Sequence, residues 1–291
     1  MKIKLIKVIV LLVMGMSGLY NCSIKALGVK AAMPVLDDIN AAVFKQSDIA
    51  LVETGLPATL IIIEGLLETS PENQDLLAMA AQALCAYGFG FIEDKDKDRA
   101  KAIYIKGRDY GIKALRQNGK FNKALKKKIP FWDAVKVIND KDMLPALFWT
   151  GQCIGNLVNL DMSDPENLVD IPKAKALMEK VMEFDDKFFF GGAHIFMGAY
   201  YAILPALFGG GLDKSEVEFK KAFEISQEKF LVAYYYYARF YVTTLKDAEL
   251  FDKTIAKIEN TPSDVLPEQK LINEIAKKKA KVLIGSKAKF F

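Results

Sequence analysis

Ile195-Phe-Met-Gly-Ala-Tyr200 and Phe219-Lys-Lys-Ala-Phe-Glu224 form a pair of segments that predicts two helices packed against each other. The first segment is rich in aromatic and small residues, and the second mixes charged with apolar residues. Two more pairs follow the same pattern: Ala146-Leu-Phe-Trp-Thr-Gly151 with Ala174-Lys-Ala-Leu-Met-Glu-Lys180, and Tyr237-Ala-Arg-Phe-Tyr241 with Phe251-Asp-Lys-Thr-Ile255. The sequence therefore indicates repeated helical hairpins.

The spacing of these pairs indicates the kind of repeat. Their charged helices end near Glu183, Glu224 and Glu259, at intervals of 41 and 35 residues, near the tetratricopeptide period of about 34. One hairpin cannot bury its own apolar face, so we expect tetratricopeptide-like hairpins stacked into a compact superhelix with a concave inner surface. Because the two intervals differ, a non-repetitive helical bundle is the alternative.

Helical periodicity extends along most of the chain. Apolar residues recur every three or four positions, and Gly, Pro, Asn or Asp mark the breaks. Ser70-Pro71-Glu72, for example, supplies a capping hydroxyl, a proline at the first helical position and an acid in the first turn. The strand-like run Leu60-Ile-Ile-Ile63 lies inside a longer helical pattern, so we predict an all-α fold. We expect helices over residues 34–54, 56–69, 72–92, 97–117, 141–160, 171–185, 192–207, 213–227, 230–245, 247–260 and 267–284.

Composition excludes several classes of protein. The chain has 291 residues, of which 52% are hydrophobic and 26% charged, so it is neither disordered nor fibrous. Its net charge of +4 falls to +1 without the first 21 residues, which gives no electrostatic reason to expect nucleic-acid binding. His194 is the single histidine in the sequence, so a multi-histidine metal site or a histidine-based catalytic relay is not expected. We predict no cofactor, no metal and no enzymatic activity.

The N-terminus is typical of an exported lipoprotein. Lysines followed by the apolar run Val8–Met16 predict a signal peptide over residues 1–21, and no other stretch is expected to span a membrane. Leu19-Tyr-Asn-Cys22 resembles a lipobox, which makes Cys22 the expected lipidation site; an ordinary cleaved signal is the alternative. We therefore predict a periplasmic protein anchored to an envelope membrane. Residues 22–33 would form a tether, and residues 34–291 a single helical domain.

Other motifs carry less information. Cys85 and Cys153 lie in apolar helical sequence, and we expect buried thiols rather than a disulfide framework. The acidic run 94–98 resembles the start of a calcium loop, but Arg99 and Ile105 stand where that loop needs glycine and glutamate. The glycine-rich run 209–215 has Asp213 before its lysine, where a phosphate loop needs glycine. The basic runs 120–128 and 277–281 are interpreted as solvated helix faces, with contact to anionic lipid as the alternative.

Aromatic residues are the candidates for ligand contact. Four consecutive tyrosines, Tyr234 to Tyr237, point in all directions around a helix, so some of them must line an inner surface or an interface. The expected helix 192–207 is apolar nearly all round, and such a helix is enclosed or lines a cavity. For His194, near its start, a core position with a hydrogen bond is the alternative. The candidate cavity residues are His194, Trp149, Phe196, Tyr200, Tyr201, Tyr234 and Tyr237.

The chain from about Pro71 onward resembles the TatT family, the T component associated with tripartite ATP-independent periplasmic (TRAP) transporters. Lys279 departs from the pattern, because the family usually has Arg there. The resemblance rests on several segments in order: Pro71-Glu-Asn-Gln-Asp-Leu-Leu through Gly-Phe-Gly-Phe-Ile92, Pro145-Ala-Leu-Phe-Trp-Thr-Gly151, Gly191-Gly-Ala-His-Ile-Phe-Met-Gly-Ala-Tyr-Tyr201 with Leu204-Pro205 and Gly209-Gly210, Tyr237-Ala-Arg-Phe-Tyr241 with Leu250-Phe251, and Leu271-Ile-Asn-Glu-Ile-Ala276.

The resemblance implies a membrane-tethered periplasmic lipoprotein with tetratricopeptide repeats. It also implies a homotrimer that docks the solute-binding P component of the transporter, and an apolar channel or cleft in each protomer for a hydrophobic or organic-acid ligand. The alternative function is a scaffold lipoprotein for envelope assembly, which would need the anchor and the repeats but no cavity.

Overall fold

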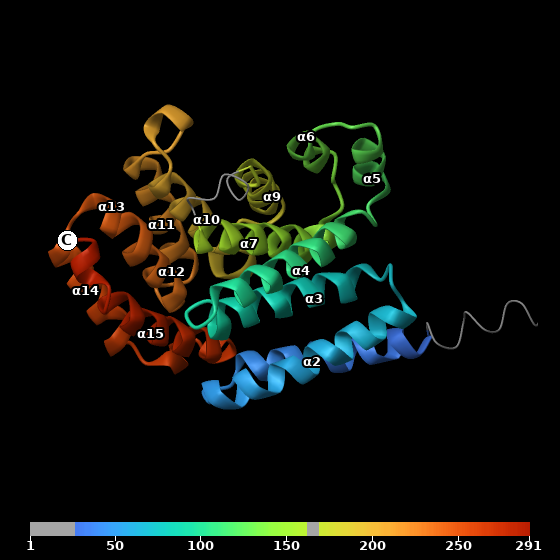
Figure 1. Ribbon diagram of the computed structural model, residues 1–291, viewed down its shortest axis with the longest axis horizontal. Coiled ribbons are helices and arrows are strands. Elements are labelled where there is room, and N and C mark those ends of the chain that lie inside the picture. The colour runs from blue at the N-terminus through green and yellow to red at the C-terminus, as the bar shows by residue number, and fades with distance from the viewer. Residues whose placement is uncertain (1–26, 162–168) are drawn as a thin grey trace, which may run out of the picture.

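The computed structural model describes residues 27–161 and 169–291, so the predicted signal peptide and Cys22 lie outside the described residues (Figure 1). Within these ranges the chain forms helices, turns and loops without a strand, and the all-α prediction is confirmed. The helices are residues 27–44, α2 (Ile49–Thr69), α3 (Gln74–Tyr87) continued by η1 (Gly88–Ile92), α4 (Lys97–Leu115), α5 (Gly119–Lys126), α6 (Phe131–Lys136), α7 (Leu144–Leu160), α9 (Ile171–Phe184), α10 (Phe188–Ile203), α11 (Leu212–Ile225), α12 (Leu231–Tyr236) continued by η4 (Tyr237–Val242) and α13 (Thr243–Leu245), α14 (Ala248–Asn260) and α15 (Lys270–Ile284), with short 3₁₀ turns at Lys141–Met143, Ala206–Phe208, Ser263–Val265, Pro267–Gln269 and Lys287–Lys289.

The helices pack in sequence order and then return toward the start. α3 packs on α4, α4 on α7, α7 on α9, and α10 on α9 and α11. The predicted pairs therefore form, since α7 contacts α9, α10 contacts α11, and α12 with η4 contacts α14. The last helix, α15, packs against α12 and α14 and also reaches α2 (Figure 1). The result is a compact superhelix whose last helix meets its first hairpin.

The N-terminal hairpin differs from the predicted one. We expected a break at Gly55, but the chain turns at residues 45–48, where the Asp48 side chain accepts a hydrogen bond from the Leu51 backbone and caps α2. α2 then runs through Pro57 without ending. A proline inside a helix removes one backbone hydrogen bond, and here the buried stripe on both sides of Pro57 outweighs that cost. Residues 27–33, expected in the tether, are helical, and Val29 is buried.

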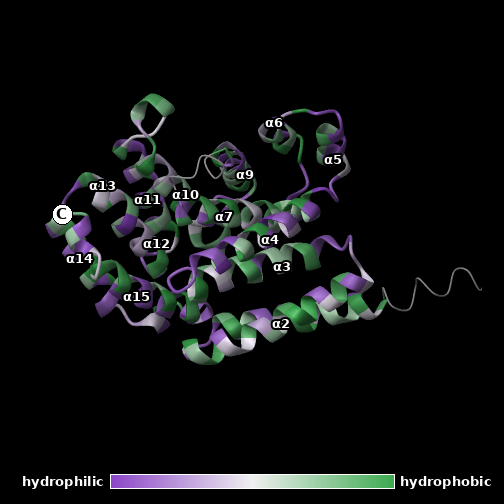
Figure 2. Cartoon of the chain, in the orientation of Figure 1, coloured by the Kyte–Doolittle hydropathy of each residue, from purple (hydrophilic) through white to green (hydrophobic). Residues whose placement is uncertain are grey.

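α2 combines an apolar composition with an exposed position. We predicted no membrane-spanning stretch after the signal, yet α2 and the segment Gln74–Ile92 are both long and apolar enough to cross a membrane by length and composition. Gln74–Ile92 is mostly buried and serves as a core helix. α2 is mostly exposed, and Figure 2 shows hydrophobic residues along its length.

Three helices depart from regular α geometry beside the interior of the molecule. α3 and α12 continue into the π-helices η1 and η4, and such turns are frequent at functional sites. α10 starts with a kink in which Phe189, Phe190 and Gly191 have positive φ angles of 47°, 58° and 76°. Left-handed backbone is costly for residues with a side chain, so the surrounding packing must hold this kink in place.

Candidate functional site

Two adjoining cavities lie between the central helices. The larger has a volume of about 60 Å³ and lies between α3 with η1, α7, α10, α12 and α15. The smaller has a volume of about 40 Å³ and lies between α7, α9, α10 and the end of α12. Their linings contain no charged side chain. The larger is lined by Cys85, Ala86, Phe89, Trp149, Gln152, Asn156, Phe189, Gly192, Ile195, Phe230, Val232, Tyr236 and Ile272. The smaller is lined by Gln152, Gly155, Val158, Asn159, Ile171, Ala174, Ile195, Phe196, Ala199, Tyr200, Ile203 and Tyr236.

Three residues, Gln152, Ile195 and Tyr236, line both cavities and therefore lie between them. Two of them share a hydrogen-bond acceptor. Gln152 Nε2 donates to Asn156 Oδ1 at 3.0 Å, and the Tyr236 hydroxyl donates to the same oxygen at 3.3 Å. Asn156 Nδ2 in turn contacts Cys85 Sγ at 3.4 Å. These polar groups satisfy one another, so the wall that separates the cavities is a closed hydrogen-bonded unit.

Burial keeps the ionisable groups of this wall neutral. Desolvation raises the pKa of Tyr236 well above its ordinary value, and the negative charge of Glu93 raises it further. Desolvation also raises the pKa of the Cys85 thiol, with an added contribution from Cys153. Both cysteines are free and buried, as expected. The cavities therefore present apolar surface and neutral polar groups to whatever enters them.

Aromatic rings form much of the larger cavity's wall. Phe89 stacks on Tyr236 with ring centroids 5.8 Å apart, and Trp149 meets Phe189 edge to face at 4.9 Å. Phe189 also meets Phe230 at 5.7 Å, so the kink at the start of α10 places this ring in the wall.

In the smaller cavity the Phe196 ring lies directly on the backbone of Gly155. A Cβ built at Gly155 would stand 2.6 Å from Phe196 Cε2, which requires glycine at this position unless the ring moves. The close contact between α7 and α10 thus depends on a residue without a side chain.

The structure brings three of the predicted candidates to the cavities and leaves four elsewhere. Trp149 lines the larger cavity, and Phe196 and Tyr200 line the smaller. His194, Tyr201, Tyr234 and Tyr237 line neither of the two.

These four residues have other contacts. His194 Nδ1 lies 2.6 Å from Glu218 Oε2, and its Nε2 makes no hydrogen bond with the described residues. Tyr201 packs on Tyr200 with ring centroids 5.3 Å apart. Tyr234 stacks on Phe223 at 4.3 Å. Tyr237 meets the same Phe223 ring at 5.5 Å, and burial raises the pKa of Tyr237 to about 12. The contacts of all four residues that are described here thus lie outside the two cavities.

Several cavity residues were not predicted. Tyr236 was part of the tyrosine run, but periodicity alone could not show which of the four rings faces inward. Asn156 is 2% exposed, and an asparagine within the apolar helix α7 is the signal that could have identified it. Phe89 and Phe189 lie on the π-helix and the kink, whose local geometry helical periodicity does not predict.

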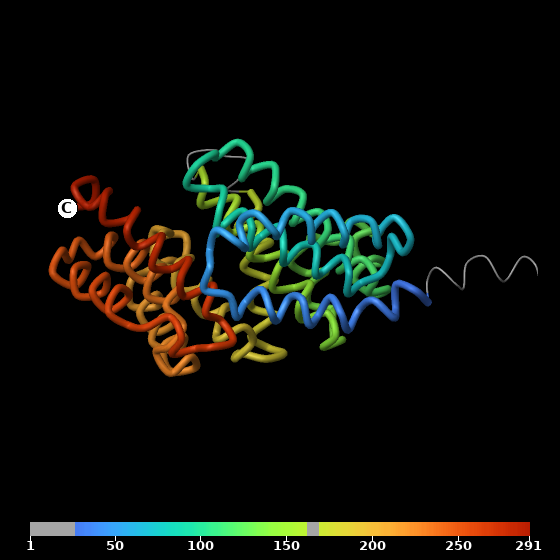
Figure 3. Tube along the Cα trace, turned by 90° about the horizontal axis from the view of Figure 1, so that it is seen from below, coloured from blue at the N-terminus to red at the C-terminus, as the bar shows by residue number. Residues whose placement is uncertain are grey.

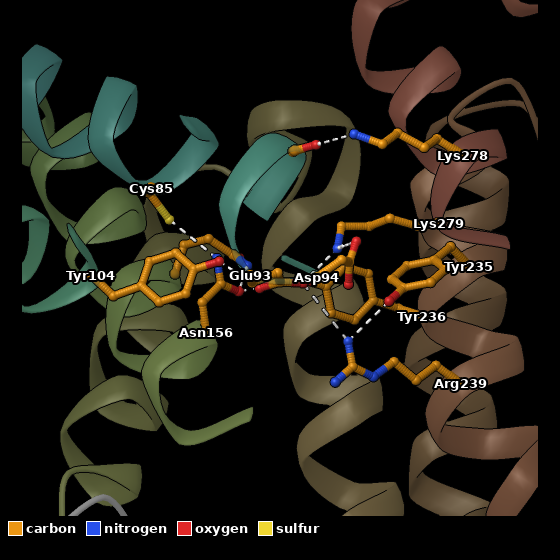
Figure 4. A network of polar contacts seen from close by, with 12 residues as sticks. Cys85, Glu93, Asp94, Tyr104, Asn156, Tyr235, Tyr236, Arg239, Lys278 and Lys279 are labelled. Carbon is orange, nitrogen blue, oxygen red and sulfur yellow. Dashed lines mark hydrogen bonds and ion pairs between the residues drawn. The ribbon is translucent and has the colours of Figure 1, made fainter. Parts of the chain in front are cut away.

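Figure 4 shows a buried ion cluster, whose Lys279 contacts Phe89 in the lining of the larger cavity. The Lys279 ammonium on α15 donates to Glu93 Oε1 at 2.6 Å and to Asp94 Oδ2 at 2.8 Å. The Tyr104 hydroxyl on α4 donates to the other oxygen of Glu93 at 2.5 Å. Lys279 is 1% exposed, so our interpretation of residues 277–281 as a solvated basic face is wrong at this position, because the carboxylates of another segment compensate its burial.

Arg239, on η4, completes this cluster. Its Nη1 donates to the Tyr235 hydroxyl at 2.9 Å and lies 4.0 Å from Glu93 Oε1. Burial disfavours the charged form of Lys279, but Glu93 and Asp94 outweigh that effect, so its pKa is raised. The Lys279 ammonium also lies 4.5 Å from the centroid of the Phe89 ring, which stacks on Tyr236 of the cavity wall. Charged cluster and apolar cavity are therefore neighbours.

The arrangement can hold a small neutral ligand but lacks a metal centre in the part of the chain that the structure describes. No group of three or more metal-ligating side chains gathers there.

Two comparisons with known proteins bear on this site. A family model described as TRAP transporter T-component matches residues 45–291. No curated protein matches the chain. The matched range contains every residue that lines the two cavities and every member of the ion cluster.

Proposed function

Since the chain belongs to the TRAP transporter T-component family, we propose that it is an accessory transporter component that holds an apolar ligand in its central cavities. In this proposal it is exported to the periplasm and anchored to an envelope membrane by acylation of Cys22. It docks the solute-binding P component of the transporter, works as a homotrimer and catalyses no reaction. The family itself supports the accessory role and an association with the envelope membrane.

The observation that supports a ligand role is the chemistry of the cavity walls. Rings, aliphatic side chains and mutually bonded amide and phenol groups line both cavities. The nearby cations, Lys279 and Arg239, already contact Glu93, Asp94 and Tyr235. A buried carboxylate without a partner costs several kcal/mol. The walls therefore favour an apolar ligand over an organic acid.

The cavities are small, and this constrains how a ligand would enter. A volume of about 60 Å³ holds only a few heavy atoms. Gln152, Ile195 and Tyr236 lie between the two cavities, so displacing these side chains would join the two volumes. A larger ligand would thus pass by opening the Tyr236–Asn156 hydrogen bond.

Titration with xenon, a neutral apolar probe small enough for these cavities, followed by xenon nuclear magnetic resonance, tests the ligand role. Ile195→Phe fills space in both cavities, and Ile255→Phe adds the same volume at a buried position on α14 that lines neither. We expect Ile195→Phe to weaken probe binding at least tenfold and Ile255→Phe to leave it within about twofold. Equal probe binding by the wild type, Ile195→Phe and Ile255→Phe would refute the ligand role.

A separate capture experiment tests docking. The acylated chain at endogenous level, crosslinked in intact cells, should retain a TRAP solute-binding component. Repeated failure to retain one would refute docking while leaving the probe result unaffected.

A further inference from the structure

α2 presents an apolar side to the outside of the molecule. Its inner side packs Val52, Leu56 and Leu60 into the core. Only 17% of its apolar 18-residue window is buried, whereas the corresponding value for Gln74–Ile92 is 78%. The exposed residues between positions 50 and 65 are all uncharged: Ala50, Leu51, Thr54, Gly55, Ala58, Ile61, Ile62 and Gly65.

The preceding helix extends this surface. Residues 27–44 run beside α2 along one side of the molecule, and Figure 3, viewed from below, looks onto both helices. This helix buries Val29, Leu36 and Phe44. Its exposed apolar residues recur every three or four positions: Leu27, Ala31, Val35, Ile39 and Ala42. We call the exposed apolar residues of the two helices the N-terminal face.

The charged residues near the N-terminal face do not indicate which partner covers it. On α2, Glu53 is paired with Lys95, and Glu64 with Lys106 at 2.5 Å. On the preceding helix, Lys30 and Asp37 are exposed at the edge of the apolar stripe, and Asp38, three residues after Val35 and four before Ala42, is exposed within it. An exposed, largely apolar surface of this kind marks contact with a membrane or with another protein.

The short distance along the chain between Cys22 and this face favours a membrane over another protein as its partner. Leu27 is 65% exposed and begins the described chain only five residues after Cys22. Five residues span at most about 18 Å in any conformation. Acyl chains on Cys22 would therefore hold the N-terminal face within reach of the bilayer surface at a high effective concentration.

We propose that the N-terminal face lies on the lipid bilayer, with Leu51, Ile61 and Ile62 of α2 in the boundary between headgroups and acyl chains. The proposal rests on the acylation of Cys22 proposed above. Because the face gains from apolar burial and α2 offers it no cation, zwitterionic lipid is sufficient. The two-point attachment would fix the orientation of the whole molecule relative to the membrane.

The test places an environment-sensitive fluorophore on the full acylated chain. Ile62→Cys, 56% exposed on α2, and Val217→Cys, 65% exposed on α11, are labelled with nitrobenzoxadiazole; Cys85 and Cys153 are buried and stay unlabelled. After reconstitution into phosphatidylcholine vesicles, we expect the label at position 62 to shift to the blue. Spin-labelled lipid should quench it at least threefold more than the label at position 217.

Three other outcomes have defined meanings. Equal emission and quenching at both positions would overturn the proposal. A blue shift at position 62 without vesicles that grows with protein concentration would assign the face to a second copy of the chain and also overturn it. If mass spectrometry finds no acylation, the anchor has failed; the labelled variants are then made with Cys22→Ser, so that position 22 takes no label, and are mixed with preformed vesicles, where a shift at position 62 supports the face and its absence refutes it.

Discussion

The buried charge of Lys279 depends on two carboxylates for its compensation. Its ammonium is 1% exposed and is bonded to Glu93 and Asp94, which lie 186 and 185 residues earlier in the chain. Burying such a pair gains little relative to apolar packing, but removing one partner leaves the other charge without compensation. Replacing one charged side chain of the cluster should therefore lower the free energy of unfolding strongly.

Replacing Lys279 tests this dependence. Lys279→Met leaves Glu93 buried opposite an apolar side chain, so we expect the free energy of unfolding to fall by about 3–5 kcal/mol. Lys279→Arg keeps the positive charge and should retain most of the stability. Urea denaturation of the three proteins measures both effects. A loss in Lys279→Met no larger than that in Lys279→Arg would show that the charge contributes nothing.

The same residue gives a pH dependence with a definite sign. Because the folded state raises the pKa of Lys279 above the unfolded value, its contribution is complete below about pH 10 and is lost as the pH rises through the folded-state pKa. The stability difference between wild type and Lys279→Met should thus stay constant from about pH 7 to 9 and shrink above about pH 10.5. Denaturation curves across this range would contradict the assignment if the difference grew with pH.

Helix irregularities place side chains where regular helices could not. The π-helix η1 carries Phe89 and is followed directly by Glu93, η4 carries Arg239, and the kink at the start of α10 places Phe189 in the cavity wall. Helical periodicity predicted the helices themselves, with most boundaries within a few residues. It missed α5 and α6, whose short apolar stripes lie in a lysine-rich stretch, and it misplaced the N-terminal turn because Pro57 does not end α2.

Gly191 provides a test of the kink. Its φ of 76° is left-handed, and a Cβ there would stand 3.3 Å from Ile225 Cδ1, so Gly191→Ala should cost about 1–2 kcal/mol of stability. Gly65→Ala is a matched control with open space around it on α2, and it should be neutral or stabilise the protein by up to about 1 kcal/mol. Thermal unfolding compares them. A Gly191→Ala protein as stable as wild type would show that the kink relaxes freely.

At the scale of the whole molecule, the closed arrangement of helices sets both the fold and the site. Pairing of apolar and charged segments predicted the superhelix, because each such pattern is local in the sequence. The site could be predicted only in part. Trp149, Phe196 and Tyr200 line the cavities, but Asn156 meets Tyr236 across 80 residues, and Lys279 meets Glu93 across 186 residues. Contacts between distant segments leave no spacing signal in one sequence.

This closure also predicts cooperative unfolding. In an open array, each repeat contacts only its neighbours and the ends can unfold first. Here α15 bonds to the segment after η1 and contacts α2, so the ends support each other. We expect a single transition in which fluorescence of Trp132 and Trp149 and far-ultraviolet circular dichroism coincide. Separate midpoints for the two probes would show that the halves unfold independently.

The ion pair between Glu93 and Lys279 has a consequence for how the protein is made. If the chain is exported amino end first, Glu93 crosses the membrane long before its partner does, and its charge has no compensating ammonium until the final helix arrives. The interior can therefore close only when translocation is nearly complete.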